Sequence, residues 1–204
     1  MNNQGFTSRR AILIGLVAAI LGLAVAPDFA SAQDEQPKTT RIYLVRHAEK
    51  VDDSRDPELS DAGKERAQHL AERLKDAEIT FVYTTPYIRT RDTARPTAKA
   101  VMQELREFNP PEPGDAAEAW AKQLLQDAAG ANVLVVAHSG RADQRGSVPS
   151  LVQALGGEEV ATITDAEYFN LYIVTITSSD DSEQIDIKRE KYGVVPDDGD
   201  GDQR

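Results

Sequence analysis

The sequence predicts an α/β fold, a three-layer α/β/α single domain in which helices cover both faces of a mostly parallel mixed sheet. Three short runs rich in β-branched and aromatic residues predict buried strands at Arg41–Val45, Ile79–Thr84 and Val133–Ala137. Patterns of helical period separate these runs, as is typical of parallel sheets built from strand–helix–strand units. We therefore expect the carboxyl ends of the three strands to meet at one edge of the sheet, where open α/β folds bind ligands.

The remaining elements are predicted from periodicity and from helix-start and helix-end signals. Four helices are expected, at Ser60–Lys75, Thr97–Leu105, Asp115–Gln126 and Ser147–Leu155. Two further strands are expected, at Asn170–Thr177 and, at an edge of the sheet, Gln184–Glu190. Asp115 is the expected N-cap of its helix. His69 lies off the apolar stripe of the first helix, among charged residues that include Arg66, and is expected to be solvated.

Residues 1–32 have the organisation of a secretory signal peptide. A polar start ends in Ser8-Arg9-Arg10, an apolar stretch runs from Ala11 to Ala26, and Ala30-Ser31-Ala32 offers a cleavage site. The apolar stretch is shorter than the ~20 residues of a membrane-spanning helix, although an uncleaved anchor stays the alternative. The arginine pair also fits a twin-arginine export signal. We expect a bacterial protein that is periplasmic or secreted, with no stable membrane insertion after cleavage.

Composition limits what the rest of the chain can do. Residues 33–40 are expected to be a polar linker, 41–194 the folded domain, and the aspartate-rich residues 195–204 a disordered tail rather than a calcium loop. The absence of cysteine excludes disulfides, zinc–thiolate sites and a cysteine nucleophile. A formal net charge of −11 disfavours nucleic acid and anionic lipid as partners. The oligomeric state stays open.

Side chains suited to phosphoryl chemistry follow each of the three predicted strands. Arg46 and His47 come directly after the first, Arg89 lies in the segment after the second, and His138 follows the third. A neutral imidazole can attack phosphorus or move a proton, and a guanidinium is a permanent cation that matches phosphate geometry. Fixed donors aimed at the phosphoryl oxygens lower the barrier to transfer. The sequence therefore predicts a phosphoryl-transfer pocket at this edge.

In order and spacing these motifs resemble those of the histidine phosphatase superfamily, the phosphoglycerate mutase-like fold, and in particular its small phosphohistidine-phosphatase-like branch. The matching segments are Arg46-His47-Ala48-Glu49, then Leu59 to Ala67, then Thr85 to Ala94, and finally Val133 to Gly140. The resemblance extends from Arg41 to about Thr177. No single segment is specific to this family, but the four segments in this order and spacing are together strong evidence for the resemblance.

The resemblance implies a role for each matching residue. His47 would be the nucleophile that takes the phosphoryl group, Arg46 and Arg89 would clamp the phosphate, and His138 would complete the pocket as a donor to phosphate. Arg91 would be a solvated residue of the following helix. The implied enzyme hydrolyses a phosphomonoester or phosphoramidate of a small substrate through a phosphohistidine intermediate, with no metal and no cofactor.

Two departures from the family pattern leave alternatives open. No general acid stands in a recognisable motif, and the candidates are Glu107, Glu112, Asp115 and Glu118. A missing acid would suit a substrate with a good leaving group. An insertion, Gly140 to Gly146, follows the second histidine, and Arg141, Arg145 and Glu49 are further candidates for the site. A catalytically weak or inactive periplasmic anion-binding module is therefore the main alternative, and a phosphomutase is a less favoured one.

Overall fold

The computed structural model describes residues 37–140, 146–157, 163–179 and 182–195. In chain order the elements are β1 (Lys38–Arg46), α1 (Asp61–Leu74), β2 (Ile79–Thr84), α2 (Ile88–Ala100), β3 (Leu105–Glu107), α3 (Asp115–Asp127), β4 (Asn132–Ala137), α4 (Val148–Ala154), β5 (Asn170–Ser179) and β6 (Ser182–Lys191). The expected signal peptide, the insertion arginines Arg141 and Arg145, and the acidic tail after Val195 lie outside the described residues. Among the helices that are described, none is both long and apolar enough to cross a bilayer.

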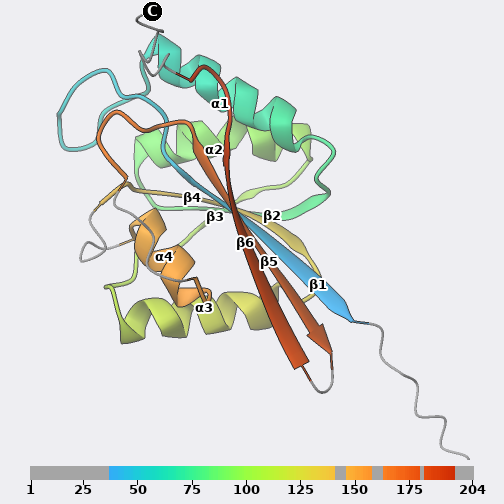
Figure 1. Ribbon diagram of the computed structural model, residues 1–204. Helices are drawn as coiled ribbons and strands as arrows, with labels where there is room; N and C mark the ends of the chain where they lie inside the picture. Colours follow the sequence, from blue (N-terminus) through green and yellow to red (C-terminus); the bar gives the residue numbers. More distant parts are fainter. Residues whose placement is uncertain (1–36, 141–145, 158–162, 180–181, 196–204) are drawn as a thin grey trace, which may run out of the picture. The chain divides into compact units, whose positions relative to one another are not determined.

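The six strands form one mixed sheet in the order β3-β2-β4-β1-β5-β6 (Figure 1). The β3–β2, β2–β4 and β4–β1 pairs are parallel, whereas β5 and β6 join antiparallel at the other side of β1. This confirms the predicted mostly parallel mixed sheet. The edge strand expected at Gln184–Glu190 is β6, which pairs only with β5 among the described strands.

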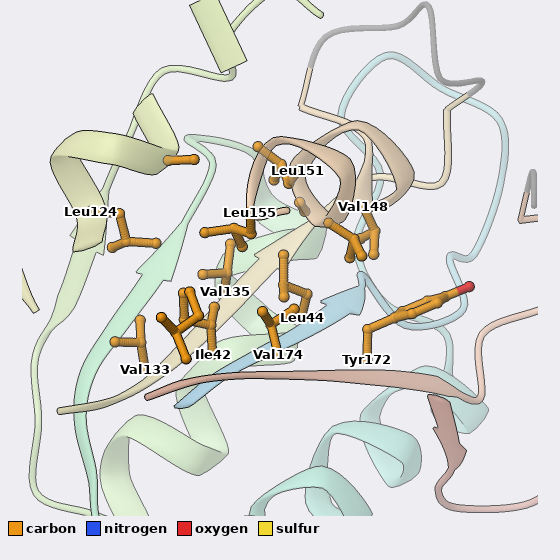
Figure 2. Close-up of a cluster of buried hydrophobic side chains, with 14 of the residues drawn as sticks. Ile42, Leu44, Leu124, Val133, Val135, Val148, Leu151, Leu155, Tyr172 and Val174 are labelled. Carbon is orange, nitrogen blue, oxygen red and sulfur yellow. The ribbon is translucent and has the colours of Figure 1, made fainter. Parts of the chain in front are cut away.

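Helices cover both faces of the sheet, which confirms the predicted three layers (Figure 1). Alternate residues of β1 point to opposite faces, so Ile42 and Leu44 belong to one buried cluster and Tyr43 and Val45 to the other. Figure 2 shows the first cluster, in which side chains of α3 and α4 pack against β1, β4 and β5. The second cluster joins the sheet to α1 and α2. Burial on both faces explains why the central strands are almost continuously apolar.

Two predicted boundaries are wrong at the start of the domain and of α3. The expected linker ends early, because β1 begins at Lys38, where the backbone already pairs with Ser178 of β5. The N-cap of α3 is Gly114, and Asp115 is the first helical residue, with no side-chain capping bond at this end. Gly114 has φ 78°, a conformation that an aspartate cap would adopt only with strain.

The helix expected at Thr97–Leu105 is misplaced. It spans Ile88–Ala100 instead, and Leu105 opens the short strand β3. The buried face of α2 repeats with helical spacing and consists of Thr90, Thr93, Ala94, Thr97 and Ala98. Because three of these five residues are threonines, a search for apolar periodicity does not detect the first two turns. Pro96 lies within the helix and gives up one backbone hydrogen bond there.

The ends of β1, β2 and β4 are level with one another. Arg46 pairs with Ala137, and Thr84 pairs with Val136, so all three strands release their chains at the same edge. Two backbone bonds continue this edge, from the His47 N–H to the Ala137 carbonyl at 2.9 Å and from the Val148 N–H to the His138 carbonyl at 2.8 Å. The predicted pocket therefore lies on hydrogen-bonded strand ends, which hold its residues in place.

Candidate active site

His47 is held in one tautomer by the residue that follows it. Its ring is 5% exposed, and Nδ1 lies 2.8 Å from the Ala48 carbonyl oxygen. A carbonyl only accepts hydrogen bonds, so Nδ1 carries the proton and the Nε2 lone pair is free. The Ala48 N–H donates to Thr93 Oγ1 at 2.8 Å, which fixes this peptide on α2. The pKa of His47 is lowered to about 3, chiefly by burial and also by the neighbouring charge of Arg46. The ring is thus neutral and oriented, with an unprotonated Nε2.

His138 lies close to His47, with ring centroids 5.6 Å apart. Its Nδ1 lies 3.4 Å from Arg89 Nη2, and because a guanidinium only donates, Nδ1 is the acceptor. The proton is therefore on Nε2, which lies 3.0 Å from Thr85 Oγ1, and Thr85 Oγ1 lies 2.9 Å from Thr90 Oγ1. Burial, followed by the charge of Arg89, lowers the pKa of His138 to about 4. Both ring nitrogens are engaged, so donation to a phosphate requires a proton on Nδ1 and loss of the Arg89 contact.

Arg89 is positioned but loosely held. Its Nη1 lies 3.5 Å from Asp56 Oδ1 and 3.5 Å from the Arg55 carbonyl, and its guanidinium stacks on Tyr87 at 4.5 Å. All of its hydrogen-bonding contacts are long, including the one to His138. Arg89 can therefore turn its N–H groups to an anion at little cost, as predicted for a phosphate clamp. Arg91, two residues further along α2, pairs instead with Glu107 at 3.2 Å.

Arg46 is buried and engaged with the segment 163–168. Nη1 donates to the carbonyls of Thr164 at 2.9 Å and Asp165 at 3.1 Å, and Nη2 donates to the Tyr168 hydroxyl at 3.3 Å. The guanidinium lies 4.0 Å from the centre of the Tyr168 ring. Only Nε is without a partner among the described residues. The charge of Arg46 acts at the site, but a phosphate that bound its Nη groups would have to displace one of these contacts.

These residues line one cavity of about 500 Å³. Arg46, His47, Arg89 and His138 share its wall with Lys50 and Arg55, which come from the loop between β1 and α1. The candidate Glu49 does not line it, because its carboxylate turns to Arg66 Nη2 at 2.8 Å. The structure thus brings together the four residues predicted from the strand ends and separates Glu49 from them.

None of the four expected acids lines the cavity in the part of the chain that the structure describes. Glu107 pairs with Arg91, and Asp115 and Glu118 lie in the first turn of α3, where the helix dipole favours carboxylates. The carboxylates nearest the predicted clamps are instead Asp165, which lies fully exposed 3.6 Å from Arg46 Nη2, and Asp56 beside Arg89. No group of three histidine or acidic side chains that could hold a metal ion occurs among the described residues.

Comparison with known proteins agrees with this geometry. Residues 42–112 match the model of the histidine phosphatase superfamily (branch 1). A 72-residue stretch is 33% identical to the probable phosphoglycerate mutase GpmB of Photorhabdus laumondii, covering 32% of this chain and 34% of that protein. These matches support similarity of this chain to the histidine phosphatase superfamily. The match to this curated relative spans only about a third of the relative's length.

Two solved structures share the fold. The structure titled Mycobacterial hydrolase 2 aligns with a TM-score of 0.56 at 14% identity, covering 78% of this chain and 94% of that one. The mycobacterial glucosyl-3-phosphoglycerate phosphatase aligns with a TM-score of 0.52 at 14% identity, covering 74% of this chain and 98% of that one. At these identities the likeness concerns the fold.

Several residues around this site have no signal in the sequence. Asp56, Tyr168 and Asp165 stand in irregular segments, so neither periodicity nor strand ends point to them. His69 was expected to be solvated, and this expectation is wrong, because its side chain and that of its charged neighbour Arg66 are covered. Arg66 is 7% exposed, and Nδ1 of the half-buried His69 is closed off from water without a partner among the described residues. The cause is the segment after β6, which returns over α1.

Proposed function

We propose that this protein is an exported, metal-independent phosphatase that hydrolyses a phosphomonoester or phosphoramidate through a phosphohistidine at His47. The match of residues 42–112 to the histidine phosphatase superfamily supports phosphatase chemistry. The observation that carries the proposal is the bond from His47 Nδ1 to the Ala48 carbonyl, because it leaves Nε2 unprotonated and aimed by a fixed peptide. Export rests on the sequence pattern of residues 1–32.

The reaction would proceed in two displacements at phosphorus. In the first, the Nε2 lone pair of His47 forms a bond to phosphorus while the bond from phosphorus to the leaving atom breaks, and the leaving group keeps that electron pair. In the second, a water molecule attacks the same phosphorus and its proton passes through solvent to the departed anion, the bond from nitrogen to phosphorus breaks with its electron pair returning to Nε2, and inorganic phosphate is released. His47 returns to its neutral state.

Charge on the phosphoryl oxygens would be stabilised by the protein's own cations. Arg89 has only long contacts to give up, so it is the first clamp, and the buried charge of Arg46 adds to it. A dianion in the cavity would offset the two arginine charges that help to lower the pKa of His138. His138 could then take a proton on Nδ1 and donate it to the phosphate.

The site is least well equipped to protonate the leaving group of the substrate. Asp165, the lining carboxylate among the described residues, is fully exposed and lies 3.6 Å from Arg46 Nη2, so the described part of the chain holds no carboxylate rigidly where a leaving oxygen would emerge. Rapid turnover therefore favours groups that depart without a strong acid, such as the imidazole of phosphohistidine, an anhydride or an acidic sugar phosphate.

An anion-binding module without turnover is the second candidate, because Arg46 engages its Nη groups with residues 163–168 rather than with the cavity. Replacing His47 distinguishes the two. His47→Ala should reduce hydrolysis of an aryl phosphate by about 10⁴-fold or more, with an unchanged circular dichroism spectrum. His69→Gln, which changes the histidine outside the cavity, is the matched control. Turnover that survives His47→Ala would exclude the histidine mechanism, and absence of turnover in the unmodified protein would favour the binding module.

A further inference from the structure

The loop between β1 and α1 places two more cations on the wall of the cavity. Lys50 and Arg55 both line it, in addition to Arg46 and Arg89. The only carboxylate among the described lining residues is that of Asp165. In a chain with a net charge of −11, four cations around one cavity are a local reversal of charge. The phosphoryl group accounts for two of the four.

Among the four lining cations, Arg55 is the one whose side chain has no polar partner in the described part of the chain. Its side chain is exposed, and its guanidinium has neither a hydrogen bond nor an ion pair with any described residue. The other three cations have partners. Arg46 is engaged with residues 163–168, Arg89 approaches Asp56, and Lys50 forms an exposed ion pair with Asp53. An exposed pair of this kind is weak and can exchange for a ligand.

The backbone that carries Arg55 is nevertheless ordered. The loop is closed by the bridge between Lys50 and Leu59 and by the bond from the Val51 N–H to the Glu58 carbonyl at 3.1 Å. Asp56 fastens its centre to α2 by accepting the Ile88 N–H at 2.9 Å. The Arg55 carbonyl itself receives the 3.5 Å contact from Arg89, so Arg55 is fixed directly beside the predicted phosphate clamp.

The size of the cavity leaves room for more than a phosphate group. A volume of about 500 Å³ is within the range of pockets that hold complete small-molecule ligands. A ligand with its phosphoryl group at His47 would extend toward the wall that carries Lys50 and Arg55. The chemistry that complements two flexible cations there is a second negative charge.

We propose that Arg55, assisted by Lys50, forms a second anion subsite, so that the substrate is a small phosphorylated molecule carrying a further anionic group. This proposal rests on the proposed function for the position of the phosphoryl group. The further group is a carboxylate or a second phosphate, since both are recognised by the same cations. A monoanionic tail would engage Arg55 first, because Lys50 must leave Asp53.

Binding of non-hydrolysable phosphonates tests the subsite independently of turnover. We would measure by calorimetry the dissociation constants of phenylphosphonate, 4-carboxyphenylphosphonate and 1,4-phenylenebisphosphonate, with wild-type protein, Arg55→Gln and Arg41→Gln. The last variant removes an exposed charge far from the cavity, near the opposite end of β1. Arg55→Gln should weaken one of the doubly functional ligands about fivefold more than phenylphosphonate, and this excess should shrink in high salt. The ligand with the larger excess identifies carboxylate or phosphate as the preferred group.

The outcomes separate the two proposals. If Arg55→Gln affects all three ligands equally, or no more than Arg41→Gln does, the second subsite is wrong, whatever the activity of the protein. If the excess is observed but aryl phosphate is not hydrolysed, the subsite stands and the phosphatase proposal fails. Hydrolysis of phenyl phosphate and 4-carboxyphenyl phosphate should follow the binding result, with the larger loss in kcat/KM for the carboxylated ester.

Discussion

Glu49 and Arg66 form an ion pair that ties the loop after His47 to α1 and to the segment after β6. Arg66 Nε lies 2.9 and 3.0 Å from the two carboxylate oxygens of Glu49, and Nη2 lies 2.8 Å from one of them. The same guanidinium donates to the carbonyls of Tyr192 at 3.0 Å and Val194 at 2.8 Å. Three segments that are distant in sequence are thus joined two residues beyond the proposed nucleophile.

Removing one partner of this pair should destabilise the domain. Arg66→Met leaves the Glu49 carboxylate, 23% exposed, without its cation and two carbonyls without donors. We expect a loss of about 3 kcal/mol in the free energy of unfolding, measured by urea denaturation. Arg73→Met, which breaks an exposed pair with Glu190, should cost less than about 1 kcal/mol. Equal losses in the two variants would show that the buried position of Arg66 adds nothing.

Gly63 is required where α1 approaches the same loop. A Cβ atom at this position would lie 2.1 Å from the Glu49 carbonyl oxygen, and backbone cannot yield as a flexible side chain does. Gly63→Ala should therefore destabilise the domain by about 1 to 3 kcal/mol, the usual cost of overpacking. In an open helix the same change would stabilise by about 1 kcal/mol. Increased stability of Gly63→Ala in urea would contradict the close approach.

Burial of two neutral histidines predicts a pH dependence of stability. The pKa of His138 is about 4 and that of His47 about 3 in the folded protein, against an ordinary value of 6.5. Between about pH 4 and 6.5 the unfolded chain binds more protons than the folded one, so the free energy of unfolding rises with pH in this window. Each histidine should cost up to about 2 kcal/mol between pH 6.5 and pH 5.

His138→Gln checks the sign of this effect. The variant should be less stable than wild type at pH 7.5, because it loses the ring contacts, but its stability should fall less between pH 6.5 and pH 5. Urea denaturation in phosphate-free buffer at several pH values measures both. A variant whose stability falls as steeply as that of wild type would mean that His138 does not titrate on unfolding in this window.

The strand ends were the most informative part of the sequence, and their prediction holds because it depends on local rules. β2 has the predicted bounds, and β1 and β4 contain the predicted runs, since β-branched residues buried on both faces admit little else. Their parallel pairing then brings Arg46, His47 and His138 together without further information. The first two turns of α2 were missed because threonines make up much of its buried face.

What the sequence could not show depends on contacts between distant segments. Arg66 has the neighbours of a solvated helical residue, and only the return of the chain after β6 buries it. Likewise Tyr168 and the carbonyls of Thr164 and Asp165 reach Arg46 across more than a hundred residues of chain. Irregular segments carry no periodicity, so their place beside the site is set by the completed fold.

Turnover should not depend on a metal ion. Arg89 and Arg46 supply the positive charge that a metal would otherwise provide, so hydrolysis of an aryl phosphate should survive a chelator and be inhibited by vanadate. Arg89→Ala should lose about 3 kcal/mol of transition-state stabilisation, measured as kcat/KM. Loss of activity in chelator that a divalent ion restores would show that the arginines are not sufficient.

The most direct measurement is the capture of the phosphoryl group on the protein. Acid-labile, base-stable phosphate should appear on His47 when wild-type protein is mixed with a ³²P-labelled substrate and quenched within a turnover, and peptide mapping should locate it there. His47→Ala should carry no such label, whereas Arg89→Ala should accumulate it more slowly. Hydrolysis without any label on His47, or label on another residue, would contradict the proposed mechanism.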